Sequence, residues 1–520
     1  MPHVPLRPRL MPALVAVTVA TALGGCSVVD DLRGGSASST TPPAEATKPP
    51  SASLARFYSQ HLAWKKCDGG YCADLSVPVD YAKPADGSIT IAVFKALARK
   101  PSQRIGSLVV NPGGPGGSGV DYAKSADFIV GAPVRQRFDI VGFDPRGVKR
   151  SAPITCFDDT QMDAMMGQDP TPDDAAEERA FEAMGARFAQ ACATKNPQLI
   201  GHVSTVDAAK DMDVLRAALG ETRLHYLGKS YGTFLGATYA DLFPQKVGRF
   251  VLDGVIAPDL TAEEVNAGQA KGFEQATQEW AKSCVEEGRC PLGTTQDQVM
   301  TRLRALLKQL DAHPVPASGR GGQHTVMVNE AWASTGIAAA MYDQGQWGIL
   351  TEALREVVDQ KRGNSLMSLA NMYAERDPTG HYEGNIMQVI YAVNCLDKPE
   401  HLTVAQYRRN AEESVAAAPT WGPYLQWSSL PCSEWKAKGQ VGPHTVSAKG
   451  ASPIVVIGTT RDPATPYEWA VRLRKQLASA SLITFDGDGH TAYTRSNGCV
   501  DGAVNDYYVS GKQPQDGLRC

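Results

Sequence analysis

Residues 224–240, LHYLGKSYGTFLGATYA, decide the fold. The apolar run LHYL predicts a short buried strand, and the residues that follow Ser230 predict a helix beginning at Tyr231. Between them, residues 228–232 (GKSYG) have the form GxSxG, in which a serine lies on a sharp turn from strand to helix. Such a pentapeptide also arises by chance. The prediction that Ser230 is a nucleophile therefore rests on the strand and the helix that flank it.

Strand-like and helix-like segments alternate on both sides of this turn. Helices are predicted at 208–219 and 231–242, and strands at 90–98, 107–111, 138–143, 249–252, 453–458 and 481–485. Alternation of this kind predicts an α/β fold with a mostly parallel central sheet and helices on both faces.

The chain between residues 258 and 450 has a different character, because long helical runs such as 299–310 and 341–358 replace the alternation. An insertion between two halves of one sheet predicts a mainly helical cap domain. Functional sites of open α/β sheets gather at the carboxyl ends of the strands, so such a cap would enclose the site. We expect a core in two parts, 56–257 and 451–520, separated by a cap at 258–450.

The N-terminus has the features of an export signal. Two arginines precede an uncharged apolar run at 10–23, which ends in Leu-Gly-Gly-Cys26. A basic start, a short apolar run and small residues are typical of a secretory signal, here residues 1–25, and the run is too short to span a bilayer. Its end resembles a bacterial lipobox, whose cysteine is lipidated; the alternative is ordinary cleavage with Cys26 free or removed. The Ser/Thr/Pro-rich residues 26–55 then predict a tether.

Composition narrows the function classes. The 520 residues are 43% hydrophobic and 20% charged, which is typical of a globular protein. The net charge of −4 provides no basic excess to neutralise phosphates, which argues against a nucleic-acid-binding protein.

The chain has eleven cysteines, and setting Cys26 aside leaves an even number in an exported chain, which predicts disulfides. Many pairings are formally open. Proximity in the sequence favours five local ones, Cys67 with Cys72, Cys156 with Cys192, Cys284 with Cys290, Cys395 with Cys432, and Cys499 with Cys520.

A nucleophilic serine needs a base, and the base needs an orienting acid. After a GxSxG serine the acid precedes the histidine in the chain. Asp462 follows the predicted strand at 453–458, and His490 follows the strand at 481–485. Asp253, also just beyond a strand, is the competing acid. Asp462 is favoured because it follows the last strand before His490.

The oxyanion formed during acyl transfer needs two N–H donors. One is expected from Tyr231, directly after the nucleophile, and the other from the glycine-rich loop after an early strand. In that loop we favour Gly114, because Pro115 has no N–H. The alternative, a phosphate-binding loop, lacks both the GxxxxGK[ST] form and the GxGxxG spacing.

Together these motifs resemble a known family. In chain order they are the lipobox, VPVDY (77–81), NPGGPGGSG (111–119), GFDPRG (142–147), GKSYG, LDG (252–254), TTRDPATP (459–466) and GDGHT (487–491). The set resembles the secreted bacterial tripeptidyl aminopeptidases, related to prolyl iminopeptidase, and closely resembles the lipoprotein group of carboxylesterase A or Hip-type serine proteases.

The resemblance implies an α/β-hydrolase core with a helical cap, a triad of Ser230, Asp462 and His490, and an anchored extracytoplasmic enzyme that attacks peptide or ester carbonyls. One departure is that Pro112 stands where prolyl iminopeptidases carry the histidine of HGGPG. Proline specificity is therefore not carried over.

An aminopeptidase must also hold a substrate ammonium, which calls for a carboxylate in the capped pocket. Residues 394–397 (NCLD) resemble the family's Cys-x-Asp segment, so Asp397 is a candidate, with Glu330 behind it. The alternative for both is a solvated surface acid. Thr465 could support the loop of Asp462 or simply cap a helix. Neither HExxH nor a CxxC pair occurs, so we expect no metal and no cofactor.

The sequence thus predicts a serine hydrolase, anchored through Cys26 to the outer face of the cell membrane, that releases short peptides such as tripeptides from N-termini. One alternative is a carboxylesterase or lipase, which uses the same oxyanion chemistry on acyl esters. Another is a non-catalytic lipoprotein that binds peptides. The oligomeric state is not predicted.

Overall fold

The computed structural model describes residues 44–318 and 325–520. The expected signal at 1–25 and the lipid attachment point Cys26 lie outside the described residues. Within them, no helix has the length and apolar character that a membrane crossing requires.

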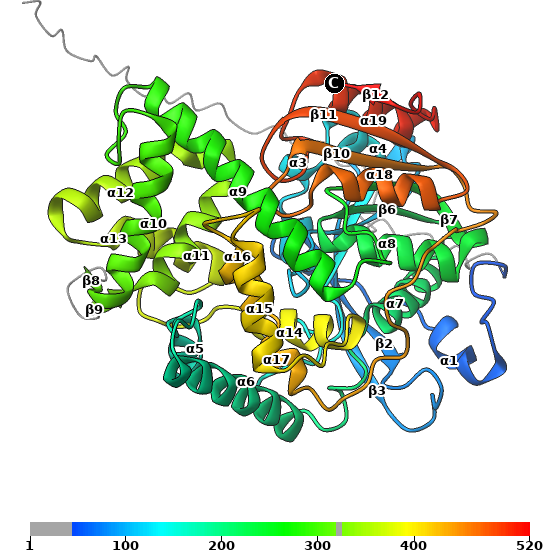
Figure 1. Ribbon diagram of the computed structural model, residues 1–520. Coiled ribbons are helices and arrows are strands. Elements are labelled where there is room, and N and C mark those ends of the chain that lie inside the picture. The colour runs from blue at the N-terminus through cyan, green and yellow to red at the C-terminus, as the bar shows by residue number, and fades with distance from the viewer. Residues whose placement is uncertain (1–43, 319–324) are drawn as a thin grey trace, which may run out of the picture. The chain divides into compact units, whose positions relative to one another are not determined.

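A ten-stranded sheet in the order β1-β2-β3-β5-β4-β6-β7-β10-β11-β12 forms the core (Figure 1). From β5 to β12 each neighbouring pair is parallel, whereas β1, β2 and β3 are antiparallel additions at one edge. The strands are β1 Lys65–Cys67, β2 Gly70–Pro78, β3 Ser88–Ala96, β4 Gly106–Asn111, β5 Phe138–Phe143, β6 Leu224–Lys229, β7 Val247–Asp253, β10 Ile454–Arg461, β11 Ala480–Asp488 and β12 Leu518–Arg519. The expected mostly parallel sheet is confirmed.

Helices cover both faces of the sheet because alternate residues of its buried strands face opposite layers. In β4, Val109 packs in one apolar cluster, whereas Leu108 and Val110 pack in another on the opposite face. The first face carries α1 (Ala55–Tyr58), α7 (Thr205–Ala218), α8 (Tyr231–Leu242) and α18 (Tyr467–Gln476). The second carries α2 (Gly119–Lys124), α3 (Ala126–Ile129), α4 (Ala132–Arg137) and α19 (Gly498–Ser510).

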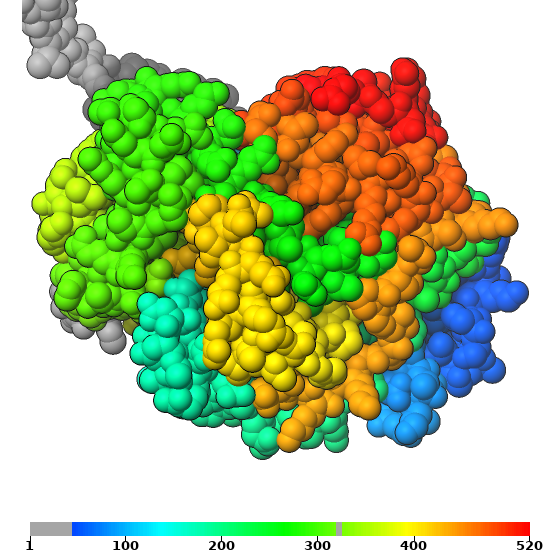
Figure 2. Space-filling model, in the orientation of Figure 1, coloured from blue at the N-terminus to red at the C-terminus, as the bar shows by residue number. Residues whose placement is uncertain are grey.

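A long insertion separates β7 from β10, although these two strands pair directly, with Phe250 opposite Ile454. It has its own apolar core, and in Figures 1 and 2 its residues near 400, in yellow, lie against those near 180, in teal. Its elements are α9 Ala262–Glu286, α10 Gln296–Ala312, β8 Val315–Ser318, β9 Thr325–Val328, α11 Glu330–Met341, α12 Trp347–Gln360, α13 Asn364–Ala374, α14 Ile386–Asp397, α15 Val404–Ser414, α16 Gly422–Trp427 and α17 Leu430–Ser433.

Three features differ from expectation. The helix expected over 341–358 is broken after α11, because Asp343 accepts a hydrogen bond from Gly345 N and starts a separate turn ahead of α12. A second helical segment, α5 (Asp159–Met166) and α6 (Ala175–Lys195), lies between β5 and β6 in the chain and packs beside the insertion. No helix is predicted there from the sequence. Finally, the described end of the expected tether belongs to the core, since Ala46 is buried and its carbonyl accepts a hydrogen bond from Arg216.

All five expected disulfides are present and confirm the local pairing: Cys67–Cys72, Cys156–Cys192, Cys284–Cys290, Cys395–Cys432 and Cys499–Cys520.

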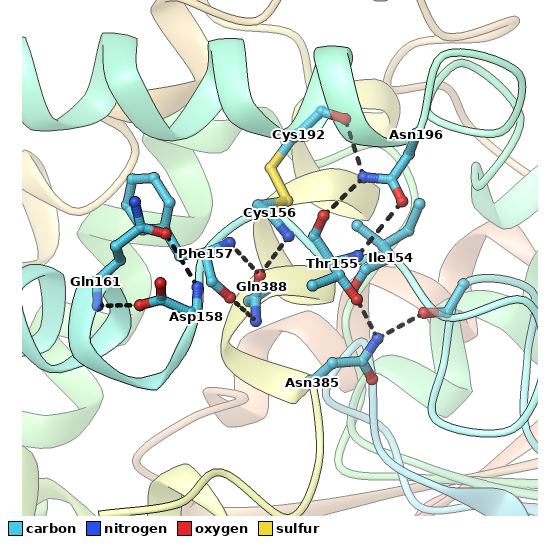
Figure 3. Close-up of a disulfide and its surroundings, with 11 residues drawn as sticks. Ile154, Thr155, Cys156, Phe157, Asp158, Gln161, Cys192, Asn196, Asn385 and Gln388 are labelled. Carbon is cyan, nitrogen blue, oxygen red and sulfur yellow. Dashed lines mark hydrogen bonds between the residues drawn. A yellow bond between two sulfur atoms is a disulfide. The ribbon is translucent and has the colours of Figure 1, made fainter.

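Helix α14 of the insertion is fastened to its surroundings at both ends. At its N-terminus, Asn385 donates to the carbonyls of Gly147 and Ile154, and Gln388 Oε1 accepts from the amides of Cys156 and Phe157, beside the Cys156–Cys192 disulfide (Figure 3). At its C-terminus, Cys395 is bonded to Cys432 of α17. The face of α14 is therefore held in a fixed position.

Replacing both Cys395 and Cys432 by Ser is expected to lower the free energy of unfolding by about 2–4 kcal/mol, because the reduced chain gains loop entropy. Chemical denaturation checks this value. The matched control removes Cys499–Cys520, which lies in the C-terminal part of the chain. Removal of either disulfide should lower the free energy of unfolding. Only removal of Cys395–Cys432 should raise KM, since Cys432 lines the cavity described below. Equal effects on KM would contradict this.

Candidate active site

Ser230 lies on a strained turn between β6 and α8, with φ 57° and ψ −127°. This conformation costs a non-glycine residue about 1–3 kcal/mol and needs close packing to persist. A side chain at Gly228 would lie 2.3 Å from the Gly232 carbonyl oxygen, and one at Gly232 would lie 2.8 Å from that of Asn111. The two glycines of GxSxG are therefore required by contact between backbones, and Ser230 remains partly exposed at the end of the strand.

The glycine-rich loop after β4 lies against this turn. A side chain at Gly113 would lie 2.7 Å from Ser230 Cβ and 3.1 Å from the amide nitrogen of Tyr231. The amide of Gly113 itself donates to Asn111 Oδ1 at 3.0 Å. Because that donor is engaged and Pro115 has none, the exposed Gly114 remains our candidate for the second oxyanion donor beside Tyr231.

Asp462 and His490 meet in the buried space beyond β10 and β11. His490 Nδ1 lies 2.9 Å and 3.0 Å from the two carboxylate oxygens of Asp462. The carboxylate also accepts hydrogen bonds from the amides of Ala464, Thr465 and Thr491 and from the Thr465 hydroxyl. These donors fix the orientation of the carboxylate, and Thr465 therefore supports the acid rather than only capping α18.

The competing acid, Asp253, has a different position. Its carboxylate accepts hydrogen bonds from the amides of Ala492 and Tyr493 and lies 3.8 Å from Lys229 Nζ. Lys229 in turn donates to the Tyr493 carbonyl at 2.7 Å. Burial raises the pKa of Asp253, which Lys229 partly offsets. Asp253 thus holds the backbone of the loop that carries His490.

A short chain of contacts connects Ser230 to His490. The Ser230 amide donates to the Asp253 carbonyl at 3.0 Å, and a side chain at the next residue, Gly254, would lie 3.2 Å from His490 Cε1. His490 Nε2 is buried and has no hydrogen-bond partner among the described residues. An imidazole held through Nδ1 with a free Nε2 is the arrangement of a general base.

The insertion contributes to this arrangement through Tyr342, directly after α11. Its carbonyl accepts a hydrogen bond from the His490 amide at 2.9 Å. Its ring meets the imidazole edge to face, with centroids 5.2 Å apart. The position of His490 therefore depends on both the core and the insertion.

A cavity of about 260 Å³ adjoins the turn, between the core and the insertion. The core contributes Gly114, Pro115, Tyr231, Phe234 and Ile256. The insertion contributes one face of α9 (Ala262, Val265, Asn266, Gln269), one face of α14 (Met387, Ile390, Tyr391, Asn394), and Tyr373, Lys398, Leu425, Ser428, Ser429 and Cys432. Both candidate oxyanion residues thus line a largely apolar cavity of the kind that binds small ligands.

Asp397, expected to hold a substrate ammonium, is not among the residues that line this cavity. It is buried, and its carboxylate accepts hydrogen bonds from the amide and the hydroxyl of Thr205. The same hydroxyl contacts the Tyr231 hydroxyl at 2.5 Å. Asp397 therefore connects the end of α14 to the residue after Ser230, and its oxygens are engaged within the protein.

Burial raises the pKa of Asp397 to about 6, from 3.8. The folded protein then binds a proton that the unfolded chain releases, so this group lowers the free energy of unfolding as the pH rises from about 4 to 6, by up to about 3 kcal/mol. Asp397→Asn, which cannot titrate, is expected to lack this decline. Urea denaturation of both proteins at pH 4.5 and pH 7.5 measures the difference, and parallel profiles would contradict the assignment.

Glu330, the second candidate for the ammonium, begins α11. It accepts hydrogen bonds from Thr171 Oγ1 at 3.0 Å and the Tyr424 hydroxyl at 2.5 Å, and burial raises its pKa. Its carboxylate lies near those of Asp169 and Asp311, with one oxygen from each within 4.8 Å of the others. It does not line the 260 Å³ cavity either. The structure therefore brings neither candidate acid into that cavity.

Four contributors went unrecognised in the sequence: Asn111, Thr205, Tyr342 and Lys398. The position of Asn111 directly before the glycine run could have indicated its role, since asparagine commonly bonds the amide two residues on. No local pattern marks Thr205, Tyr342 or Lys398, because they act through contacts between distant parts of the chain.

Comparisons with known proteins agree with this geometry. A sequence family described as alpha/beta hydrolase fold matches residues 106–344, and one described as TAP-like protein matches residues 418–520. Serine protease Hip1 of Mycobacterium tuberculosis is 38% identical over 463 residues, 87% of each chain. Carboxylesterase B of the same organism is 36% identical over 457 residues, 86% of each chain. Tripeptidyl aminopeptidase of Streptomyces lividans is 32% identical over 493 residues, 90% of this chain and 88% of that one. The chain belongs to this family of TAP-like α/β-hydrolases, and it is a hydrolase.

Proposed function

We propose that the chain is a serine peptidase that releases short peptides, tripeptides in particular, from peptide N-termini through an acyl-enzyme on Ser230. The observation that supports this most strongly is His490, whose Nδ1 contacts Asp462 while its buried Nε2 has no partner among the described residues. The names of the relatives, serine protease and tripeptidyl aminopeptidase, support peptides as the substrate class.

In this proposal Ser230 Oγ attacks the scissile carbonyl as its proton passes to His490 Nε2. The amides of Tyr231 and Gly114 donate to the resulting oxyanion. Collapse of the tetrahedral intermediate breaks the C–N bond, and His490 returns the proton to the leaving amine. Water, activated by the same imidazole, then releases the acyl group and restores Ser230. Asp462 keeps the imidazole in the required tautomer.

The proposal includes export and lipid anchoring through Cys26, at the outer face of the membrane. It is based on the basic and apolar start of the chain and on Leu-Gly-Gly-Cys26. Five disulfides among the described residues fit an oxidising compartment. Metabolic labelling with a fatty-acid probe, compared between the native chain and Cys26→Ser, tests the anchor.

An esterase activity is the second candidate, and the cavity supports it. Its lining is largely apolar and, among residues 44–318 and 325–520, includes no carboxylate that could hold an ammonium. Ester and amide hydrolysis pass through the same oxyanion, so the catalytic groups serve both. The relative named Carboxylesterase B is consistent with this activity.

A direct comparison separates the candidates. A fluorophosphonate should label Ser230. Tripeptide anilides should be cleaved, and those with a free N-terminus should be cleaved faster than the same anilides with a blocked N-terminus. Cleavage of esters alone would refute the peptidase proposal. Absence of labelling at Ser230 would refute the serine mechanism altogether.

A further inference from the structure

Among the described residues that line the cavity beside Tyr231, one side chain is charged, and it is the cation Lys398. Lys398 follows α14 and is only 6% exposed. Its ammonium donates to the Leu260 carbonyl and lies 4.9 Å from the centre of the Phe234 ring. An ammonium has three N–H donors, so this contact leaves further donors for a ligand.

The acids near Lys398 have other hydrogen-bond partners, although Asp259 Oδ1 is buried and has none among the described residues. Asp397 is bonded to Thr205, Asp259 and Glu264 are bonded to Arg472, and Glu400 accepts from Tyr407 and Ser429. Among the described residues, none of these carboxylates forms an ion pair with Lys398 within 4 Å. Burial lowers the pKa of Lys398 to about 8, so the ammonium is still mostly protonated at neutral pH.

The remainder of the cavity suits the stem of a substrate side chain. Met387, Ile390 and Tyr391 of α14 line the cavity together with Phe234 and Val265 and provide apolar walls. Asn394, one helical turn before Lys398, adds a carboxamide on the same face of α14. Apolar walls with one cation and several amide and hydroxyl groups match a short methylene chain that ends in a carboxylate.

We propose that this cavity is a substrate subsite for a side chain that ends in a carboxylate, with glutamate as the best fit, and that Lys398 determines this specificity. The inference rests on the proposed function, because it assigns the substrate class of the same site. A buried cation that forms no ion pair within the described part of the chain gains one when a carboxylate binds, whereas a lysine or arginine side chain would place two cations together. The peptide's own N-terminal ammonium must then lie outside this subsite.

Peptides that carry Glu, Gln, Met or Lys test the subsite when each residue is placed in turn at the three positions before the scissile bond and the first position after it. At one position the native enzyme should cleave the Glu peptide about tenfold faster than the Gln peptide in kcat/KM, which corresponds to about 1.4 kcal/mol. The Lys peptide should be the slowest. Peptides with an amidated C-terminus should keep the preference, because the carboxylate recognised belongs to the side chain; a ratio that depends on the free chain end would contradict the subsite.

Variants of Lys398 test whether its ammonium causes the preference for Glu over Gln. Lys398→Met should bring the Glu to Gln ratio close to one, whereas Lys398→Arg, which keeps the charge, should retain it. Lys475→Met, which removes an exposed lysine of α18, is the matched control and should leave the ratio unchanged. A similar loss of preference in Lys475→Met, or full preference in Lys398→Met, would overturn the role of Lys398.

A second readout measures occupancy of the site at Ser230 and needs no variant. The same peptides should protect Ser230 from fluorophosphonate labelling, with the Glu peptide protecting best. If Ser230 is labelled but neither cleavage nor protection distinguishes Glu from Gln at any position, the subsite proposal fails while the serine mechanism stands. If Ser230 is not labelled at all, the proposed function itself fails.

Discussion

Ser230→Ala is expected to lower kcat by about 10⁶-fold, since removal of the nucleophile from a triad costs about as much as removal of the whole triad. The fold should be unaffected. The Ser230 amide donates to the Asp253 carbonyl and its carbonyl accepts from Thr233, and both contacts involve backbone atoms of Ser230 that alanine also has. Kinetics with a tripeptide anilide and a nitrophenyl ester measure the loss of kcat. A thermal unfolding curve checks that the fold is unaffected.

The matched control is Ser510→Ala, which removes an exposed hydroxyl at the end of α19. It should leave both kcat and fluorophosphonate labelling unchanged. Residual hydrolysis by Ser230→Ala of about 10³–10⁴-fold over water is compatible with the mechanism, because the oxyanion donors remain. A variant that keeps more than a few per cent of native kcat on either substrate would show that another group is the nucleophile.

The order of secondary structure could be predicted because it depends on local pattern. The apolar runs that became β4, β5, β6 and β7 are short and bounded by turn residues, and the helix after Ser230 begins and ends where the sequence places it. The secondary structure of the insertion was harder to predict from the sequence, since the break between α11 and α12 depends on a single side-chain cap at Asp343.

The candidate site was predictable in part for the same reason. Ser230, Asp462 and His490 each follow a strand at the same edge of the sheet, so chain order alone places them near one another. The roles of Asp397 and Lys398 could not be assigned in this way. The two neighbours have different surroundings, since Asp397 bonds Thr205 and Lys398 lines the cavity. Only the packing of α14 against the core decides which of them lines it.

Asp462→Asn is expected to lower kcat by about 10⁴-fold, because an amide at this position favours the wrong tautomer of His490. It should also lower the free energy of unfolding by about 1–3 kcal/mol, because a buried donor loses its acceptor. The expected loss follows from geometry: both oxygens of Asp462 lie within 3.0 Å of Nδ1 of the histidine. An asparagine would present an N–H₂ group toward one or more of the donors that now bond the carboxylate. Steady-state kinetics across pH, with labelling of Ser230 as a second measure of nucleophile activation, would record the effect.

Asp253→Asn provides the matched comparison, since it makes the same chemical change in the other buried acid beside this loop. Asp253 accepts from the amides of Ala492 and Tyr493 and does not bond the imidazole, so its replacement should act mainly on folding. Leaving one of these buried donors unpaired costs about 1–3 kcal/mol in unfolding free energy. The decrease in kcat should be far smaller than for Asp462→Asn. A carboxylate that does not touch the imidazole cannot control its tautomer. If Asp253→Asn stays folded and loses more kcat than Asp462→Asn, Asp253 is therefore the acid that supports His490 in catalysis, and the assignment of Asp462 is wrong.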